Sequence, residues 1–408
     1  QQTKSNPQIL LKRQELENNY LQFVNSSDQY RLSNTVITIP VVFHIIYSNP
    51  SQNISNAVIM SQLETINKDF SKTNSDTGSI PLAIKSVAAN SNIQFCLAQQ
   101  DPSGNSTTGI LRIPVASDPQ DFFPTGISPL WSGNKYLNIY VYNMPSGILG
   151  IAQMPGAGEG AVSVTYYSVG GTSVPGSGPP YNLGRTLTHE IGHWLNLEHT
   201  FENGCSGTTA STCLTSGDNV CDTPPSNGNG GCPGFINTCT ESSPFPPPYT
   251  SDMPDQWMNY MDYTDDACMF MFTSGQVSRM LATLTGVRSG LLTSTGCNPP
   301  SIAITIKTFV EGYYSGSGQQ TPALINSGNG INPAQSDIVT IELRNPVSHA
   351  IAYTTSAVMK TNGEIPVLFP LNLNGSNLYI VIRGRNFVET WSKTPLLLSN
   401  NAYFNFSN

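Results

Sequence analysis

Apolar residues follow strand-like and helix-like patterns in turn along the first part of the chain. The run "NTVITIPVVFHIIYS" (34–48) is rich in β-branched and aromatic residues and predicts a buried strand. Apolar residues then recur at helical spacing from Ile59 to Phe70, which predicts a helix capped by Ser55 or Asn56. Further strands are expected at 92–99 and 137–144 and in the runs "GILGIAQMPG" and "GAVSVTYYS".

A second helical pattern follows these strands. It is expected to be capped by Asn182 or a neighbour, and its apolar stripe lies roughly opposite His189 and His193. One face is therefore suited to a core and the other to chemistry. The stripe consists of Leu183, Leu187, Ile191 and Leu195. Helical spacing also occurs around Leu10 to Phe23 and at 272–284, where Ser274 is the expected cap.

The remaining pattern divides the chain into parts. Residues 1–35 are polar and are interpreted as an N-terminal extension, a candidate remnant of a pro-segment. Residues 201–256 hold much Cys, Gly and Pro and predict a long loop. After Cys297, strand-like runs separated by Gly, Asn and Pro predict a small all-β sandwich at 298–408. We therefore expect an α+β domain at 36–297, followed by this accessory domain.

Composition narrows the classes of function. Charged residues make up 11% of the chain and the net charge is −8, with no cluster of Lys and Arg, which argues against nucleic acid as a partner. No segment approaches the ~20 apolar residues that a membrane-spanning helix needs. No signal peptide precedes Gln1, so we expect the numbering to begin after one was removed.

Eight cysteines indicate the compartment. Six of them lie between Cys205 and Cys268, and five of these six fall in the region predicted to be a loop. An even number of clustered cysteines indicates disulfides and hence a secreted protein. The alternative is a second zinc site with cysteine ligands, although no CxxC pair is present to form it.

The stretch "HEIGHWLNLEHTF" (189–201) contains three of the five histidines of the chain. On a helix, His189 and His193 lie one turn apart on the same face and could bind one Zn²⁺, with His199 as the third ligand. Glu190 could accept a proton from a water that the zinc activates. The alternative is a surface helix with incidental histidines, which the third histidine makes less favourable.

The same stretch resembles the extended zinc signature HExxHxxGxxH of the metzincin metalloproteases. Together with "GDNVCDTP" (217–224), "NYMDYTDDAC" (259–268) and "FTSGQ", it resembles the pappalysin family, in particular its compact, ulilysin-like members. The resemblance spans roughly 36–297 and implies a catalytic domain with a mixed twisted sheet and an active-site helix. It implies Met261 as the methionine of the turn below the zinc. It has one departure: Asn196 replaces the glycine that ends the zinc helix in a left-handed conformation, which Asn tolerates best among the other residues.

The resemblance also implies roles for other residues. Tyr263 would stabilise the tetrahedral intermediate, unless it is a core tyrosine under the site. Asp266 would form the base of the pocket for the residue after the scissile bond and select Arg or Lys, unless it is a solvated or calcium-bound acid. The strand pair around 137–155 would form the upper rim of the cleft, to which a substrate would add as an antiparallel strand.

Structural calcium near the active site is a further implication. Asp218, Asp222 and Thr223 are the candidate ligands, and the alternative is a turn with Asx caps. The implied disulfides are Cys232–Cys268 and Cys205–Cys239, which leave Cys213–Cys221 and Cys96–Cys297. His44 and His349 are expected to be structural.

The sequence therefore predicts a secreted zinc endopeptidase that acts on proteins or peptides and cleaves on the amino side of Arg or Lys. One alternative is a surface adhesin with a structural zinc site, in which the β-sandwich binds a surface or a glycan. Another is a non-peptidase hydrolase that uses the same zinc. An acidic residue of the N-terminal extension such as Asp28 is a candidate for keeping the enzyme latent, because no cysteine precedes Cys96.

Overall fold

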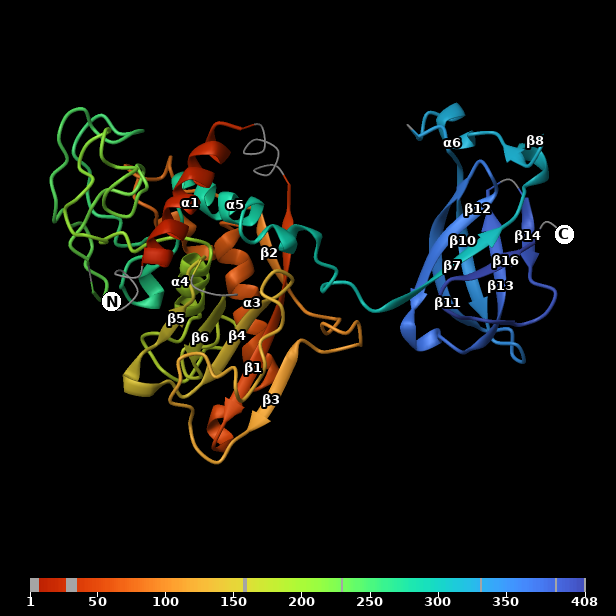
Figure 1. Cartoon of the computed structure of the whole chain (residues 1–408), viewed down its shortest axis with the longest axis horizontal. Helices are drawn as coiled ribbons and strands as arrows, with labels where there is room; N and C mark the ends of the chain where they lie inside the picture. The colour runs from red at the N-terminus through yellow and green to blue at the C-terminus, as the bar shows by residue number, and fades with distance from the viewer. Residues whose placement is uncertain are drawn as a thin grey trace. The chain divides into compact units, whose positions relative to one another are not determined.

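The computed structural model describes residues 7–26, 35–156, 160–228, 230–330, 332–385 and 387–406. The chain divides into two compact units, Gln1–Asn298 and Pro299–Asn408 (Figure 1). Each unit has its own apolar core. Among the described residues, no helix has both the length and the apolar character needed to cross a membrane.

A six-stranded mixed sheet forms the centre of the first unit. Strand β1 pairs in parallel with β2, β3 and β4, and β4 pairs in parallel with β6. The last strand of the order β2-β1-β4-β6-β5 runs antiparallel to its neighbour and forms an edge. The predicted mixed sheet is thus confirmed. The strands are β1 (Ile37–Tyr47), β2 (Ile93–Leu97), β3 (Ile110–Pro114), β4 (Leu137–Tyr142), β5 (Gly150–Ala152) and β6 (Ala161–Thr165).

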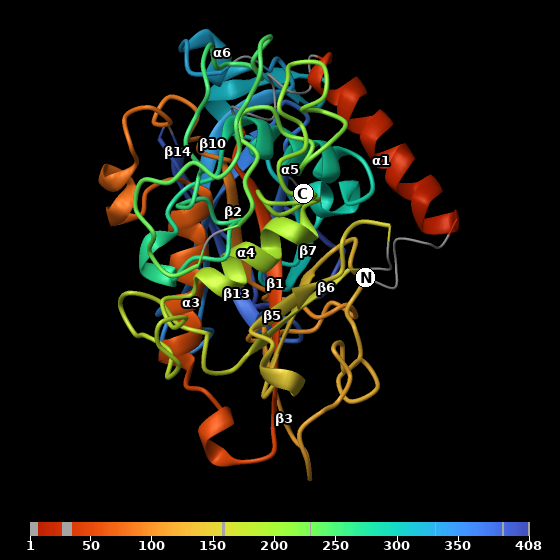
Figure 2. The ribbon, with the colours of Figure 1, turned by 90° about the vertical axis from the view of Figure 1, so that its left-hand side faces the viewer.

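Among the residues that the structure describes, four α-helices accompany this sheet. Helix α4 packs against β5, β6 and α3, and all of its residues are buried (Figure 2). Helix α1 packs on α5 (Figure 1). Because α4 is buried on all sides, both of its faces contact other parts of the chain: it lies between the sheet and the loops. The helices are α1 (Pro7–Val24), α3 (Asn56–Phe70), α4 (Arg185–Trp194) and α5 (Ser274–Thr285).

The helix caps agree with the sequence only in part. The Ser55 side chain accepts a hydrogen bond from Val58 N and caps α3 as predicted. The cap predicted for α4 is wrong, because α4 begins after Gly184 and the amide of Asn182 donates instead to Gly176 O. Helix α5 is capped by Thr273, one residue before the predicted Ser274. Strand β3 was not predicted; four of its residues are only partly buried, and Pro114 is exposed.

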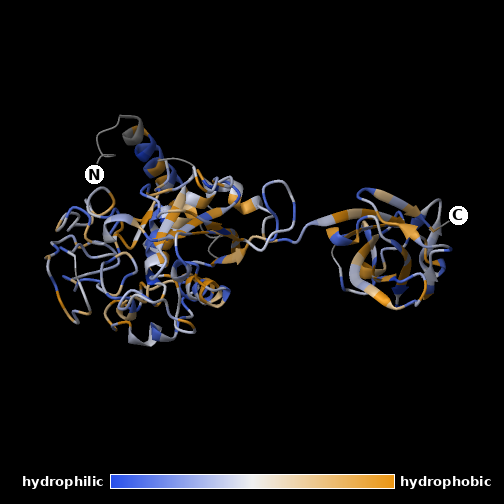
Figure 3. Ribbon diagram, turned by 90° about the horizontal axis from the view of Figure 1, so that it is seen from below, coloured by the Kyte–Doolittle hydropathy of each residue, from blue (hydrophilic) through white to orange (hydrophobic). Residues whose placement is uncertain are grey.

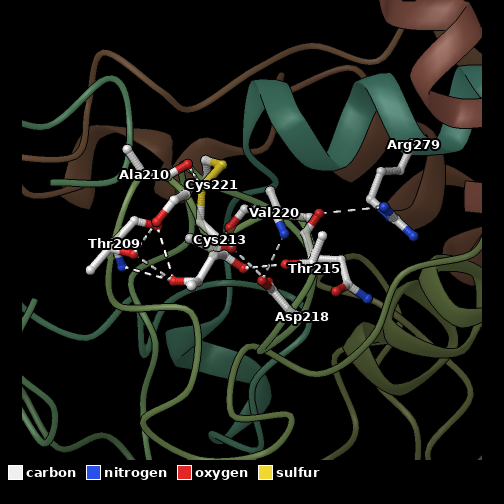
Figure 4. The surroundings of a disulfide bond; sticks show 12 residues. Thr209, Ala210, Cys213, Thr215, Asp218, Val220, Cys221 and Arg279 are labelled. Atoms are coloured by element: carbon white, nitrogen blue, oxygen red, sulfur yellow. Dashed lines mark hydrogen bonds between the residues drawn. A yellow bond between two sulfur atoms is a disulfide. The ribbon is translucent and has the colours of Figure 1, made fainter. Parts of the chain in front are cut away.

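Residues 201–228 and 230–256 contain no helix and none of the labelled strands. Figure 2 shows this segment, in light green to green, as a group of loops. The disulfides Cys205–Cys239, Cys213–Cys221 and Cys232–Cys268 fix it to itself and to residue 268, and Cys96–Cys297 closes the rest of the unit. Cys232–Cys268 and Cys205–Cys239 are the pairs that the family resemblance implied, and the other two are the pairs that these left. Asp218 and Arg279 lie close to the Cys213–Cys221 bond (Figure 4).

The second unit is a β-sandwich, as predicted. Its alternating strands, such as β7 with Ile302, Ile304 and Ile306 buried, turn apolar side chains into a common core, and Figure 3 shows apolar stretches along its strands. The five-stranded sheet has the order β11-β10-β13-β14 with β15 on β13, and the three-stranded sheet has the order β12-β7-β16. The elements are β7 (Ser301–Lys307), β8 (Tyr314–Gly316), β9 (Gln319–Gln320), α6 (Ala323–Asn326), β10 (Gln335–Arg344), β11 (Ile351–Lys360), β12 (Glu364–Pro370), β13 (Asn377–Gly384), β14 (Phe387–Trp391), β15 (Leu396–Leu397) and β16 (Ala402–Asn405).

Candidate active site

Helix α4 presents two histidines on one face, one turn apart. The Nδ1 atom of His189 lies 2.7 Å from Tyr260 O, and that of His193 lies 2.7 Å from Leu197 O. A carbonyl oxygen can only accept a hydrogen bond, so Nδ1 carries the proton in both rings. The Nε2 atom of each ring is therefore left with a free lone pair.

The third histidine reaches the site through a sharp turn after α4. Asn196 has a φ of 72°, so the left-handed conformation expected for this position is present. Asn196 N donates to His193 O at 2.9 Å, and Leu197 N donates to Gly192 O at 3.0 Å. These bonds satisfy the last carbonyls of the helix in the manner of a glycine-terminated helix. Asn thus replaces Gly and the turn is kept.

The three histidines converge on one point. Nε2 of His193 lies 3.0 Å from Nε2 of His189 and 3.1 Å from Nε2 of His199. Since His189 and His193 are protonated on Nδ1, their facing Nε2 atoms cannot donate to each other, and their lone pairs repel unless a cation lies between them. Three neutral imidazoles around one open position are the ligand set of a catalytic zinc site. His189, His193 and His199 form a zinc-binding triad.

Glu190 lies beside this triad and is 6% exposed. Burial raises the pKa of its carboxyl to about 8. A cation bound at the triad would favour the charged carboxylate and oppose this effect. Strand β5 approaches the same carboxylate so closely that a Cβ added to Gly150 would lie 2.7 Å from Oε1 of Glu190. Because Gly150 has no side chain, the Glu190 carboxylate can occupy this space.

Met261 lies in a buried turn beneath the histidines. Its side chain is fully buried, and its sulfur occupies the space next to Gly192 of α4. The turn also holds the segment that carries His199, because Thr200 N donates to Met261 O at 3.2 Å and Thr200 Oγ1 donates to Asp262 at 3.0 Å. The turn thus connects the helical ligands with the third one.

Tyr263 faces the triad from the solvent side. It is 56% exposed, so the alternative of a core tyrosine under the site is wrong. Its ring centroid lies 5.5 Å from that of His189, 4.7 Å from that of His199 and 4.9 Å from that of Phe201. The Tyr263 ring is therefore half exposed and lies beside the rings of two histidines of the triad.

A cavity of ≈ 520 Å³ adjoins the histidines. Asp266, in a short 3₁₀ turn (Asp266–Cys268), forms part of its wall and is 1% exposed. Its Oδ2 accepts hydrogen bonds from Leu183 N at 2.8 Å and Arg185 N at 3.2 Å, at the start of α4. Burial raises the pKa of this carboxyl to about 6. Asp266 is thus buried in a cavity beside the triad and not solvated at the surface. The wall consists of Ile148, Leu149, Gly150, Tyr181, Arg185, Thr186, His189, Glu190, Gly230, Asp262, Tyr263, Thr264, Asp266 and Met269.

Arg185 is a member of this wall that the sequence analysis missed. Its guanidinium is 4% exposed, forms an ion pair with Asp69 and donates to Asp76 at 2.8 Å. It also donates to the Tyr260 hydroxyl at 3.0 Å. One signal was available: Arg185 is the single arginine between Arg112 and Arg279, and it lies one helical turn before His189, on the same face of the helix.

The predicted upper rim is wrong for one of its two strands. Strand β4 is buried at every position and pairs with β1 and β6 inside the sheet. Only β5 lies at the edge, next to α4 and the cavity. Thr165 N donates to Leu149 O and Gln153 N donates to Ala161 O, so by the antiparallel alternation Gly150 and Ala152 turn their backbone groups away from β6.

The three candidate calcium ligands are buried in the loop that follows α4. Asp218 accepts hydrogen bonds from Val220 N and from the Thr223 hydroxyl, and burial raises its pKa to about 8. Asp222 accepts from the Thr273 hydroxyl and from Gly275 N, which places it at the start of α5. All four carboxyl oxygens thus already have donors from the chain, and Asp222 serves as a helix cap.

The two remaining histidines lie away from the triad. His44 is fully buried in β1, where its Nδ1 lies 2.7 Å from the Ser128 hydroxyl and its Nε2 lies 3.1 Å from Oδ1 of Asn138. His349 lies in a turn of the second unit, 5.8 Å from the Tyr379 ring between centroids. Neither lines the cavity, in agreement with their expected structural roles.

Comparisons with known proteins agree with this geometry. The family model described as Peptidase M43, pregnancy-associated plasma protein-A, matches residues 127–285. An extracellular metalloprotease of Verticillium alfalfae is 33% identical over 261 residues, which cover 62% of this chain and 79% of that protein. Extracellular metalloprotease 1 of Coccidioides posadasii is 33% identical over 264 residues, with the same shares.

Solved structures are similar as well. A mutant of promirolysin from Tannerella forsythia is 36% identical, with a TM-score of 0.60, and the match covers 71% of this chain and 93% of that one. Mature mirolysin of the same organism, in complex with a cleaved peptide, is 39% identical, with a TM-score of 0.54, over 64% of this chain and 96% of that one.

The fold, the zinc triad and these matches define the chain as a zinc metallopeptidase with an extended histidine signature. Within that class it belongs to the pappalysin family, peptidase family M43. Its relatives are extracellular metalloproteases, and the chain is a secreted zinc metalloendopeptidase that acts on protein substrates.

Proposed function

We propose that Glu190 is the general base and acid of peptide hydrolysis. A zinc ion held by the triad supplies Lewis-acid chemistry and lowers the pKa of water. Glu190 accepts the proton of the attacking water and later donates it to the leaving amine. The supporting observation is the buried carboxyl group directly beside three converging histidines, in the wall of the cavity.

We further propose that Tyr263 stabilises the negative charge that develops on the scissile carbonyl oxygen. Its support is a half-exposed ring in contact with the rings of His189 and His199. The phenol can donate a hydrogen bond, and a donor near the developing oxyanion lowers the barrier. Met261 supports the histidines from below by packing against Gly192.

The proposed cleavage position is the amino side of Arg or Lys. A basic side chain that follows the scissile bond would enter the cavity and meet the carboxylate of Asp266. A charge-assisted hydrogen bond to a buried carboxylate strongly favours a cation over a neutral side chain. Asp266 is therefore the specificity residue of the proposal.

The substrate is proposed to bind as an extended strand along β5. Gly150 and Ala152 turn their backbone groups away from β6, at a sheet edge that borders the cavity. An added antiparallel strand would satisfy these groups. The scissile bond would then lie next to Glu190, which contacts Gly150.

The experiment compares digestion of a denatured protein mixture by the wild-type chain, by Glu190→Ala and by Asp266→Asn, with and without a zinc chelator. We expect products that begin with Arg or Lys, their loss with Glu190→Ala or chelator, and relaxed specificity with Asp266→Asn. Asp265→Asn is the matched control, since this neighbouring acid does not line the cavity. Zinc-dependent cleavage without basic residues after the bond would refute the specificity alone.

We also propose that Asp218, with Thr223 and Asp222, binds calcium. The support is a buried carboxyl group with a raised pKa and, among the described residues, no cationic partner in direct contact, which a bound cation would stabilise. If so, Ca²⁺ raises the melting temperature of the wild-type chain and not that of Asp218→Asn. Equal responses of the two chains would remove Asp218 from the site.

The division into a catalytic domain at 36–297 and an accessory domain at 298–408 is also proposed, supported by the two separate cores. We propose no ligand for the accessory domain.

Residues 1–35 are also proposed to be a pro-segment. Helix α1 packs on α5, with Tyr20 and Phe23 buried, while Asp28 lies outside the described residues. A chain lacking residues 1–35 would be more active if this proposal holds.

A further inference from the structure

The wall of the cavity beside the zinc triad contains the basic residue Arg185 and the acidic residues Glu190, Asp262 and Asp266. Asp266 and Arg185 both line it, and the positive charge of Arg185 acts on the carboxyl group of Asp266. A guanidinium or ammonium group that enters this cavity would be attracted by Asp266 and repelled by Arg185. At distances of a few ångströms and away from bulk water, the attraction and the repulsion are of similar size. The selectivity of the cavity therefore depends on how completely the charge of Arg185 is balanced.

Two carboxylates outside the cavity wall balance Arg185. Asp69 on α3 has a fully buried side chain, forms an ion pair with one end of the guanidinium, and accepts from the Thr188 hydroxyl of α4 at 2.6 Å. Asp76, in the short 3₁₀ turn Ser75–Ser79, accepts from the other end at 2.8 Å. The group of Arg185, Asp69 and Asp76 thus carries a formal charge of −1, and removal of one carboxylate leaves it neutral.

The two carboxylates differ in what else they do. Asp69 connects α3 with α4 inside the core, so its loss would remove the buried carboxylate that pairs with Arg185 and the acceptor of the Thr188 hydroxyl, and would destabilise the fold. The side chain of Asp76 is 28% exposed and lies on a surface turn, where the Asn74 amide donates to its other oxygen. Asp76 can therefore be neutralised without opening the core, and its charge can be studied separately.

We infer that Asp76 is a specificity-determining residue: through Arg185 it makes the cavity favourable for a basic side chain after the scissile bond. This inference rests on the proposed function of Asp266 and extends it from one carboxylate to a set of four charged groups. Asp76 does not line the cavity, so it acts through Arg185 and through the local field and does not touch the substrate. It is a positioning and charge-balancing residue and takes no part in the chemical step.

A charge-balancing role of Asp76 and a purely structural role predict different kinetics. Peptides with Arg and with citrulline after the scissile bond have nearly the same shape, but only Arg is charged. The charge of Asp76 should contribute to the Arg peptide and hardly at all to the citrulline peptide. Because the effect concerns binding of the side chain, it should appear mainly in KM.

The experiment measures kcat/KM of the intact, zinc-loaded chain for this peptide pair. For the wild-type chain, we expect kcat/KM for the Arg peptide to be well above kcat/KM for the citrulline peptide. In Asp76→Asn, the ratio of these two values should be about tenfold lower, a change of about 1.4 kcal/mol. Asp76→Glu, which keeps the charge, should restore most of the ratio. Asp101→Asn is the control for net charge, because Asp101 lies on the loop after β2 and accepts hydrogen bonds only from that loop.

The outcomes separate the two proposals. An unchanged ratio in Asp76→Asn, or an equal loss for both peptides, overturns the role of Asp76 while the function of Asp266 stands. A wild-type ratio near one means that the cavity does not select a basic side chain, and then the proposed specificity itself is wrong. Equal melting temperatures of Asp76→Asn and Asp101→Asn exclude a general loss of folding as the cause.

Discussion

The helix α4 and the loop of residues 201–256 border the same zinc site but are held in place by different means. Every residue of α4 is buried, and its position follows from the backbone ladder of the helix and from packing against β5, β6 and α3. The loop has no labelled helix or strand in its described residues and depends on disulfides. His199 lies at the boundary of the two regions, one turn after the end of α4.

This difference indicates which side chains need a fixed position. The groups proposed to take part in the reaction, His189, His193 and Glu190, lie on the element with the most cooperative backbone. The loop contributes Gly230 to the cavity wall, and in the loop covalent bonds replace a hydrogen-bonded ladder. Variants that weaken one kind of support and leave the other intact therefore test whether the two regions are independent.

The largest effect is expected from removing the Cys232–Cys268 disulfide by a double change to serine. Its partners are 36 residues apart, so the loop-closure model predicts a loss of about 3–4 kcal/mol of unfolding free energy. The Cys213–Cys221 pair, with a separation of 8, should lose less, about 2–3 kcal/mol. Denaturant unfolding measures both, and a larger loss for the shorter loop would contradict the dependence on loop length.

The next effect concerns α4 and the strand beside it. In Gly150→Ala the new methyl group would overlap the Glu190 carboxylate, which must then move. We expect kcat to fall about a hundredfold, within the range of a displaced general base, while bound zinc stays at one per chain. Gly126→Ala is the control, because a Cβ there meets nothing within 4 Å. Metal analysis together with steady-state kinetics decides; a variant that also loses zinc would point to damage of α4.

A smaller effect is expected from pH. Because the pKa of Asp266 is raised to about 6, its carboxylate is charged above this pH and becomes neutral as the pH falls through it. The ratio of kcat/KM for Arg and citrulline peptides should therefore fall about tenfold between pH 7 and pH 5. Protonation of the zinc ligands affects both peptides alike and cancels in the ratio. A ratio independent of pH in this range would contradict the role of Asp266.

The smallest effect is expected at the end of α4. Asn196→Gly removes the cost of a left-handed Asn and should raise the unfolding free energy by less than about 1 kcal/mol, since Gly also increases the entropy of the unfolded chain. Asn196→Ala should lower it by about 1 kcal/mol. Thermal unfolding checks the order Gly, Asn, Ala, and any other order would show that the side chain of Asn196 does more than tolerate the turn.

Local patterns predicted some elements and missed others for a clear reason. The zinc helix, the cap at Ser55 and the turn at Asn196 each depend on residues within a few positions of one another. The ion pairs of Arg185 join residues more than a hundred positions apart, so no spacing in the sequence indicates them. The rim was predicted wrongly because β4 and β5 both look like strands, and only the order of the sheet shows which one forms the edge.

The short edge strand β5 has a consequence for the choice of natural substrates. A chain can lie along Gly150–Ala152 only if several of its own residues are extended and free of other partners. For a folded target, this requires local opening before cleavage, so the rate would depend on the free energy of that opening as well as on the basic residue. Two targets with the same cleavage sequence could then differ greatly in lifetime, according to how often each exposes that sequence.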